Sequence, residues 1–358
     1  MKLLALTRYG RCGASSRLRF LQFIPALEAQ GHSVRVSPLF DDRYVEALGE
    51  APIHRLGPAL SGYLRRLWIL LWRPDWDLVW LEKEALPWCP AWLERWLLRR
   101  RPYVLDFDDA IFHRYDHHPN RWVRDWFGHR LDGILAGAAL VTVCNPYLES
   151  QVRFRGAHTT AVLPTVLDPD RYASTWRPPG NPFVVGWIGS PSTTAYLRGL
   201  APALSRLSRR FPLVLRIVGA VSAKRSASLD LPGVPIETLP WSEETEAAVV
   251  ASFDVGIMPL PEGPWERGKC GYKLLQYMAS GKPVVASPVG VNATLVTPEV
   301  GFLAVTEADW EQALTVLQMD SALAAQLGQA GRARVMKNYA LQGQTLRLHR
   351  LLLMTTLF

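Results

Sequence analysis

Cysteine is scarce in this 358-residue chain, and long apolar runs are absent from it. Its four cysteines (Cys12, Cys89, Cys144 and Cys270) are scattered without metal-type spacing, which indicates a reducing, cytoplasmic compartment. No stretch of about 18 uncharged apolar residues occurs, so we expect no transmembrane helix. The apolar run at the N-terminus is too short for the core of a signal peptide, and we expect it to form a buried strand.

The sequence also lacks the Gly-x-Gly-x-x-Gly fingerprint of dehydrogenases and the dense basic stripe of nucleic-acid-binding proteins. Its net charge is +8, a mild excess that suits an anionic ligand or membrane surface. Lysine is rare as well, because only seven of the 40 basic residues are lysines. Three of them, Lys269, Lys273 and Lys282, fall within 14 residues, which indicates a shared task.

Short apolar segments alternate with longer helical patterns, which is typical of parallel α/β sheets. In the first half we expect strands at 2–7, 32–39, 77–81, 102–107, 139–144 and 159–164, with a helix at 17–30. In the second half we expect strands at 183–189, 213–219, 234–239, 254–260, 283–287 and 301–305. The helices expected there span 197–209, 243–252, 272–280, 310–317 and 321–357.

This order predicts an α/β fold with two Rossmann-like domains and an interdomain cleft. The prolines and glycine of 177–182 predict a linker between an N-terminal domain, 1–176, and a C-terminal domain, 183–335. A final helical segment, 336–358, is expected to pack back on the N-terminal domain. In sheets of this type, ligands bind at the carboxyl ends of the strands.

The loop before the helix expected at 272–280 carries Lys269, Gly271 and, one turn further, Lys273. A helix start leaves about four backbone N–H groups unpaired and has a partial positive charge. Glycine lets the backbone approach a ligand, and the lysines add full charges. These features predict a diphosphate site, although an ordinary solvated loop is the alternative interpretation.

Three further places carry candidate ligand-binding residues. The loop at 189–194 offers Gly189, Ser190, Ser192 and Thr193 at a helix start, where hydroxyls and backbone amides suit phosphate. The loop after the first strand offers Gly13, Ser15, Ser16 and Arg17, of which Arg17 is expected to reach phosphate or acceptor. Trp241, at a strand end, either stacks on a nucleobase or packs in the core.

An acidic cluster, Asp106, Asp108 and Asp109, follows the apolar run Tyr103–Leu105 at the expected carboxyl end of a strand. Three interpretations compete for it: an Asp-x-Asp metal site, a contact with sugar hydroxyls or the acceptor, and a helix cap. We favour the second, with Asp108 and Asp109 as catalytic residues and Asp106 on the acceptor or diphosphate side.

Tryptophans recur every four residues at two places, accompanied by arginines. One segment, 63–76, contains Trp68 and Trp72, and the other, 88–101, contains Trp92 and Trp96. An aromatic and basic helix can lie in a membrane interface, whereas core-facing aromatics with an arginine rim are the plainer interpretation.

The segments GKCGYKLLQYMASGKPVVASPVGVN, VVGWIGSPSTTAYL and GASSRLRF resemble the retaining, GT-B-fold glycosyltransferases of the GT4 (group 1) family. The resemblance extends over nearly the whole chain and is strongest at 180–300. It implies that the second domain holds the nucleotide, that the first holds the acceptor, and that no metal or other cofactor takes part. It also places Asp108 where the family has a histidine near the transferred sugar.

The chain departs from the family at its acidic pair. The family's ribose-binding carboxylate falls on Gln276, whose amide can still bond to hydroxyls. The first glutamate of the pair falls on Gly268, while Glu262 and Glu266 lie nearby but out of register. The family's phosphate-binding arginine and lysine also have no clear match here.

The resemblance implies transfer of a sugar from a nucleotide-diphosphate-sugar donor, with retention, to a lipid-linked or polysaccharide acceptor in cell-envelope or exopolysaccharide biosynthesis. The expected place is the cytoplasm, with peripheral docking on the inner face of the plasma membrane through its anionic lipids. Two alternatives are a non-catalytic nucleotide-sugar-binding protein of the same fold and a GT-B-like sugar-nucleotide epimerase. No nucleic acid is expected as a partner.

Overall fold

The structure is a computed structural model that describes residues 1–46, 53–72, 75–173, 177–219, 221–222, 225–226 and 231–355. Its contacts form two compact units. Unit 1 comprises residues 1–165, 267–270 and 341–358, and unit 2 comprises 166–266 and 271–340. The prolines and glycine of 177–182 predict a linker there, whereas the contacts divide the chain after Thr165. The expected domain boundary at residue 176 lies outside the described residues.

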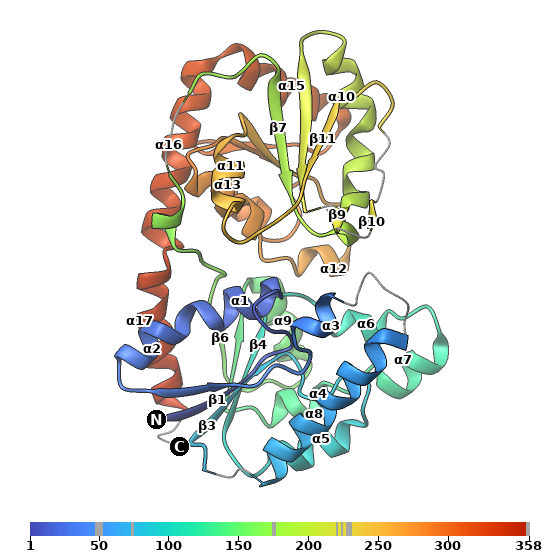
Figure 1. Cartoon of the computed structure of the whole chain (residues 1–358), viewed down its shortest axis with the longest axis vertical. Coiled ribbons are helices and arrows are strands. Elements are labelled where there is room, and N and C mark those ends of the chain that lie inside the picture. The colour runs from blue at the N-terminus through green and yellow to red at the C-terminus, as the bar shows by residue number, and fades with distance from the viewer. Residues whose placement is uncertain are drawn as a thin grey trace. The chain divides into compact units, whose positions relative to one another are not determined.

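In its described part, unit 1 is built on a six-stranded parallel sheet in the order β2-β1-β3-β4-β5-β6 (Figure 1). The strands are β1 (Lys2–Leu6), β2 (Ser33–Val36), β3 (Leu78–Glu82), β4 (Tyr103–Phe107), β5 (Leu140–Val143) and β6 (Thr160–Val162). All six expected strands of the first half are therefore confirmed. Because the chain reverses direction across the sheet between β1 and β3, ligands are expected at the carboxyl ends of these two strands.

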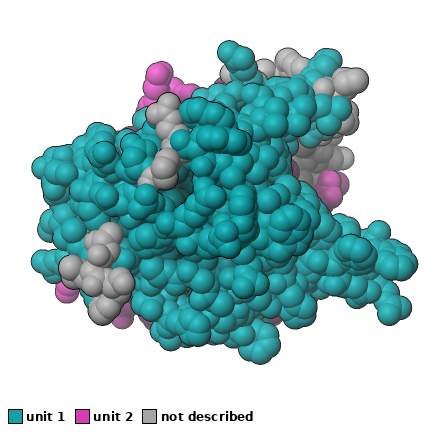
Figure 2. Space-filling model, turned by 90° about the horizontal axis from the view of Figure 1, so that it is seen from below, with its two compact units in different colours: residues 1–165, 267–270, 341–358 teal, residues 166–266, 271–340 magenta. Residues whose placement is uncertain are grey.

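The helices of unit 1 include α1 (Ala14–Arg19), the 3₁₀ turn η1 (Leu21–Phe23), α2 (Ile24–Ala29), α3 (Asp42–Glu46), α4 (Ile53–Trp72), α5 (Ala91–Leu98), α6 (His113–Asp116), α7 (Arg121–Phe127), α8 (Asp132–Ala136), α9 (Pro146–Phe154) and α17 (Leu341–Met354). Helix α4 lies beside α5, and α17 packs on α2 (Figure 1). The teal surface in Figure 2 belongs to this unit.

The single helix expected at 17–30 is wrong. Phe20, with φ −128° and ψ −67°, interrupts it between α1 and η1. Pro25 then stands at the start of α2, where its missing N–H is tolerated, although it would break a continuous helix.

The described part of unit 2 has a second six-stranded parallel sheet, in the order β11-β8-β7-β12-β13-β14. Its strands are β7 (Phe183–Ile188), β8 (Leu213–Val218), β11 (Ile236–Leu239), β12 (Val255–Met258), β13 (Val284–Ala286) and β14 (Gly301–Leu303), and a small hairpin joins β9 (Val221–Ser222) to β10 (Arg225–Ser226). This is the doubly wound Rossmann order, with its reversal between β7 and β12. The six expected strands of the second half are confirmed.

The sheet of unit 2 is buried on both faces. Alternate residues of β7 belong to different core clusters, with Val185 and Trp187 in one and Val184 and Ile188 in the other. Among the described helices, α10 (Ala201–Ser208), α13 (Tyr272–Ala279), α15 (Glu307–Met319) and α16 (Ser321–Asn338) contact this sheet. The other helical elements along this part of the chain are η3 (Pro169–Arg171), η4 (Pro191–Leu200), α11 (Glu246–Ala251), α12 (Pro264–Arg267) and α14 (Asn292–Leu295). The helical character expected at 321–357 is confirmed over its described part, which divides into α16, ending before Tyr339, and α17 (Leu341–Met354), which belongs to unit 1.

Candidate functional site

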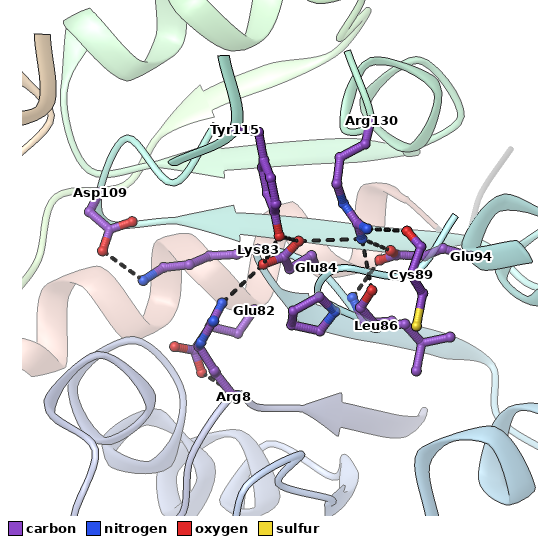
Figure 3. A network of polar contacts seen from close by, with 12 residues as sticks. Arg8, Glu82, Lys83, Glu84, Leu86, Cys89, Glu94, Asp109, Tyr115 and Arg130 are labelled. Carbon is purple, nitrogen blue, oxygen red and sulfur yellow. Dashed lines mark hydrogen bonds and ion pairs between the residues drawn. The ribbon is translucent and has the colours of Figure 1, made fainter. Parts of the chain in front are cut away.

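The carboxyl ends of β3 and β4 in unit 1 bring together a lysine and two aspartates. Lys83 Nζ lies 2.8 Å from Asp108 Oδ1. It also lies 3.0 Å from Asp109 Oδ2, the contact that Figure 3 shows. Burial alone would lower the pKa of Lys83, but the two carboxylates raise it well above its ordinary value. The same ammonium holds the pKa of Asp108 below its ordinary value against the effect of burial. Lys83 and Asp108 therefore stay ionised, and the two contacts hold the lysine between both aspartates.

Lys83 was missed in the sequence, although a signal for it exists. It follows directly on the buried strand β3, which ends next to the point where the sheet order reverses. Its φ of +61° is unusual for a residue with a side chain, and it turns the chain sharply at this point.

Behind Lys83, a buried network surrounds Glu84 (Figure 3). Tyr115 Oη donates to Glu84 Oε2 at 2.8 Å, and Arg8 and Arg130 lie 3.1 and 3.3 Å from the carboxylate oxygens. Arg130 also pairs with buried Glu94 at 2.6 Å. Buried charges of this kind are costly unless they are paired, and here acids and bases alternate. This network makes the backbone next to Lys83 rigid.

Asp106 has a different environment from its two neighbours. It is 1% exposed, and the guanidinium of Arg19 donates to both of its oxygens, at 2.8 and 2.7 Å. Thr142 Oγ1 donates to Oδ1 as well, at 2.5 Å. The oxygens of Asp106 are thus engaged within unit 1, which favours a structural role over the substrate contact expected from the sequence. The helix-cap alternative for this cluster is wrong, since α6 starts after Phe112 with no side-chain cap.

The loop after β1 lies at the same edge of the sheet. A hydrogen bond from Ser15 helps to keep Asp108 ionised, and Ser16 Oγ donates to Glu82 Oε2 at 2.6 Å. Gly13 leaves no room for a side chain, because an added Cβ would lie 2.4 Å from Tyr9 Cβ. Arg17 is 6% exposed and donates to the Arg11 carbonyl at 3.1 Å. Ser15 thus joins the group around Asp108, whereas Ser16 and Arg17 are held inside the unit.

In unit 2, two predicted donor-binding segments meet at the carboxyl end of β7. A Cβ built on Gly189 would lie 2.8 Å from Lys273 Cε and 2.5 Å from Trp187 Cη2. Lys273 Nζ lies over the ring of buried Trp187, 5.0 Å from its centroid. The Gly189 loop and the first turn of α13 therefore form one cationic corner. The absent side chain at Gly189 is what lets Lys273 lie there.

Trp241 belongs to the same corner. Gly219 ends β8 with φ +81°, and an added Cβ there would lie 2.6 Å from the Gly189 carbonyl oxygen and 3.2 Å from Trp241 Cβ. The indole N–H of Trp241 donates to Glu246 Oε2 at 2.8 Å. Trp241 is half-buried at a strand end, as the sequence predicts. Gly219 and Glu246 were not identified from the sequence.

Gln276 lies on the buried side of α13. It is 2% exposed, and its amide nitrogen donates to Tyr172 Oη at 3.1 Å, while Tyr172 donates to Glu246 Oε1 at 3.1 Å. Gln276 and Trp241 are thus joined through Tyr172 and Glu246. The ribose contact of Gln276 stays a prediction. The structure adds that Gln276 belongs to a buried hydrogen-bond network.

The remaining predicted residues lie near helix starts. Ser190 and Ser192 are exposed, with their hydroxyl oxygens 2.9 Å apart, and Thr193 Oγ1 donates to the Ser190 carbonyl at 3.0 Å. Gly271 precedes α13 with φ +70°, a conformation that favours glycine. The carbonyl of Lys269 accepts a hydrogen bond from Asn145 Nδ2 at 3.1 Å, within unit 1.

Most tryptophans of the two segments in unit 1 are exposed, whereas Trp76 is half-buried. Leu56, Leu60, Leu64, Trp68 and Trp72, which we name the α4 stripe, recur every four residues and are 46–66% exposed. Trp92 and Trp96 are exposed on neighbouring α5, and Trp122 and Trp126 on α7. Among the described helices, none combines the length and apolar character needed to cross a bilayer.

Comparisons with known proteins agree with this architecture. The model of the family "Glycosyl transferases group 1" matches residues 182–320, and that of "Glycosyl transferase 4-like domain" matches residues 16–165. A search of curated proteins found no match.

Solved structures resemble the chain over almost its whole length. Sucrose-phosphate synthase from Thermosynechococcus elongatus has a TM-score of 0.70 at 18% identity, with 98% of each chain covered. HepE from Anabaena, in complex with UDP and glucose, has a TM-score of 0.69 at 17% identity, with 98% of this chain and 99% of HepE covered. WaaG, a glycosyltransferase involved in lipopolysaccharide biosynthesis, has a TM-score of 0.68 at 13% identity, with 98% of this chain and 99% of WaaG covered. These likenesses confirm the GT-B-like fold.

Proposed function

Because the chain belongs to the group 1 glycosyltransferases, it is a retaining, nucleotide-sugar-dependent glycosyltransferase, and we propose that it glycosylates a lipid-linked or growing envelope polysaccharide acceptor. The donor would bind to unit 2 and the acceptor to unit 1. Since HepE was crystallised with UDP and glucose, a uridine diphosphate sugar is the first donor to test.

The observation that carries the donor assignment is the packing of Lys273 against Gly189 and Trp187. A lysine fixed beside an open glycine loop offers full positive charge, and the start of α13 adds its partial positive charge. Such groups stabilise a leaving diphosphate as its charge develops, and they do so without a metal. The half-buried indole of Trp241 lies beside the same loop, where a nucleobase would bind.

Lys273→Ala tests this assignment, with Lys337→Ala as control because Lys337 is an exposed lysine on α16 of the same unit. A charged hydrogen bond contributes about 1.5–3 kcal/mol, so nucleotide affinity should fall roughly ten-fold or more in Lys273→Ala. Calorimetry with UDP and a panel of other nucleoside diphosphates measures the change. Equal affinities in both variants would remove Lys273 from the donor site.

On the acceptor side, we propose that Asp108 and Asp109 contact the transferred sugar or the attacking hydroxyl. Asp109 is the more accessible of the two, with 21% of its side chain exposed against 11% for Asp108. Lys83 would act as a positioning residue that keeps Asp108 charged and holds both carboxylates in place. Asp108→Asn should therefore lower the transfer rate more than it lowers donor affinity.

The surface of unit 1 supports a membrane-bound acceptor. The α4 stripe is a row of exposed leucines and tryptophans, and tryptophan favours the headgroup region of a bilayer. Arg99 and Arg100 lie over the ring of Trp96, and Arg100 reaches the Leu71 carbonyl near the end of α4. Apolar contact and positive charge thus occur together, which suits reversible docking on an anionic leaflet.

A further inference from the structure

The turn that follows the Asp106–Asp109 loop gathers three potential metal ligands. His113 and His117 are four residues apart, and Asp116 is three residues from His113, so all three share one side of α6 and its end. His113 Nδ1 lies 3.0 Å from Asp116 Oδ1. The two imidazole rings stack at 4.3 Å. One ligand atom from each residue lies within 4.8 Å of the other two.

Two of these side chains are held from behind by α9. His113 Nε2 lies 2.8 Å from Tyr147 Oη, and Asp116 Oδ2 bonds to the guanidinium of Arg155. Histidines that bind metals usually make a hydrogen bond through their second ring nitrogen, which fixes the orientation of the ring. His113 is 9% exposed and already has such a bond, whereas His117 is exposed and leaves a path for an ion to enter.

We propose that His113, Asp116 and His117 bind a divalent transition-metal ion, for which Zn²⁺ is the best fit. Two imidazoles and one carboxylate suit Zn²⁺ better than Mg²⁺ or Ca²⁺, which take mainly oxygen ligands. Tetrahedral Zn²⁺ holds N and O ligands about 2.0–2.2 Å away, and therefore about 3.4 Å from one another. The His113–Asp116 pair is already close to that spacing, and rotation of exposed His117 completes the set.

The ion takes the place of the proton between His113 Nδ1 and Asp116 Oδ1. That proton moves to Nε2 of the same ring. The hydroxyl of Tyr147 donates to Nε2 before the move and accepts from it afterwards, so it can bond to both tautomers. The ligand set contains neither Asp108 nor Asp109, so the role of the ion is structural. It fixes the α6 turn, which directly follows the loop that carries those aspartates, and α9 supports the ligands from behind.

A zinc titration of the untagged, EDTA-stripped full chain tests the site. Calorimetry should give one Zn²⁺ per chain, Co²⁺ should give the visible absorption of a tetrahedral complex, and Zn²⁺ should raise the melting temperature by mass action. His117→Ala alters an exposed side chain and should lower the affinity at least about ten-fold. Tyr147→Phe removes only the supporting hydroxyl and should lower it roughly ten-fold.

His129→Ala is the matched control. His129 and Asp132 form a similar pair, three residues apart with Nδ1–Oδ2 at 2.9 Å, but His129 is not part of the three-ligand group. Zinc binding that survives His117→Ala, or that falls equally in His129→Ala, overturns the proposal. The proposed zinc site is independent of the donor site. In EDTA, sugar transfer should therefore persist, while the zinc-dependent gain in melting temperature is lost.

Discussion

Lys83 Nζ lies 2.8 Å from Asp108 Oδ1, and this ion pair connects the carboxyl end of β3 to the loop after β4. It joins the point where the sheet order reverses to the acidic cluster seen in the sequence. Because Lys83 is 3% exposed, we expect it to influence a substrate only through Asp108 and Asp109.

Lys83→Met should make the stability of the protein more sensitive to acid. A depressed carboxyl pKa contributes stability above the unfolded value, 3.8 for Asp108, and this contribution is lost as the pH falls through the folded value. Without Lys83, burial raises the pKa of Asp108, so stability should begin to fall at a higher pH. Breaking a buried pair also costs roughly 3–5 kcal/mol. Urea unfolding between about pH 4 and 8 measures both effects.

The control for that series is Lys337→Met, which removes an exposed lysine. Asp109→Asn is a milder companion, because it leaves Lys83 paired with Asp108. An unchanged pH profile in Lys83→Met would show that the pair does not set the ionisation of Asp108.

Gly189→Ala should weaken donor binding by displacing Lys273. The added Cβ would lie within 2.8 Å of Lys273 Cε and against the ring of Trp187, which is 1% exposed and cannot yield. Gly199→Ala is the matched control, because an added Cβ there meets nothing within 4 Å. Calorimetry with nucleoside diphosphate should show reduced affinity for Gly189→Ala alone. Equal affinities would place the diphosphate elsewhere.

The sequence predicts the strands and the fold well, because most strands are short, largely apolar runs between turn residues, and β2 (SVRV) and β11 (IETL) are the more polar exceptions. It predicts helix continuity poorly. The expected helix 17–30 has regular leucine spacing, yet Phe20 and Pro25 break it. The spacing of apolar residues shows which side of a segment is buried, but it does not show whether the helix is continuous. Two short helices that bury the same face keep the same spacing.

The candidate site divides along similar lines. Gly189 and Lys273 could be predicted from the sequence, because glycine loops and lysines at helix starts have local sequence signals. Lys83 and Glu246 could not, because their roles arise from contacts between segments distant in the chain, such as Glu246 with Tyr172. Asp106 was assigned a substrate contact for the opposite reason. Its partner Arg19 lies 87 residues away, so no local sequence feature distinguishes the role of Asp106 from that of Asp108.

Acid should loosen the docking of α17 within unit 1. His32 Nε2 lies 2.8 Å from His349 Nδ1, and burial, with the N-terminal amine and His349, lowers the pKa of His32 below its ordinary 6.5. A lowered histidine pKa means that stability is present above about pH 6.5 and is lost as the pH falls, because the unfolded chain binds the proton first. The protection of the amides of 341–354 against hydrogen exchange, corrected for the intrinsic slowing of exchange in acid, should therefore fall below that pH.

His349→Gln can still bond to His32 but carries no second ionisable ring, so it should reduce the acid effect. His129→Gln, at an exposed histidine, should leave it unchanged. Protection factors that stay level across this pH range in the unmodified protein would contradict the prediction.

Gln276 can be tested for ribose binding separately from its structural contact. Gln276→Leu removes both, whereas Tyr172→Phe removes only the hydroxyl that Gln276 and Glu246 share. If Gln276 reads the ribose, nucleotide affinity should fall several-fold more in Gln276→Leu than in Tyr172→Phe. Gln276→Glu should bind nucleotide but lose stability, because a buried carboxylate would then face the Tyr172 hydroxyl, which already donates to Glu246. Equal affinities in the first two variants would assign Gln276 to the network alone.

The last prediction concerns the α4 stripe and the arginines beside it. The protein should co-sediment with anionic vesicles and not with neutral ones, and high salt should release it. Arginines near an anionic surface contribute roughly 1 kcal/mol each, so Arg99→Ala with Arg100→Ala should weaken binding by about 2 kcal/mol, or roughly thirty-fold. Arg66 is unsuitable for this test, because it is 1% exposed and donates to the carbonyls of Thr7, Ser37 and Ala85.

Leu60→Ser with Leu64→Ser tests the apolar part of the same surface. Both leucines are more than half exposed, so the change should spare the fold and weaken vesicle binding. Phe154→Ser on α9 is the control, because it removes a side chain that is 85% exposed outside the stripe. If Phe154→Ser weakens binding as much as the leucine pair, the contact is general adhesion of apolar groups. Selective loss in the leucine pair identifies α4 as the docking surface, because among the described residues exposed leucines recur every four positions only on α4, the helix of Trp68 and Trp72.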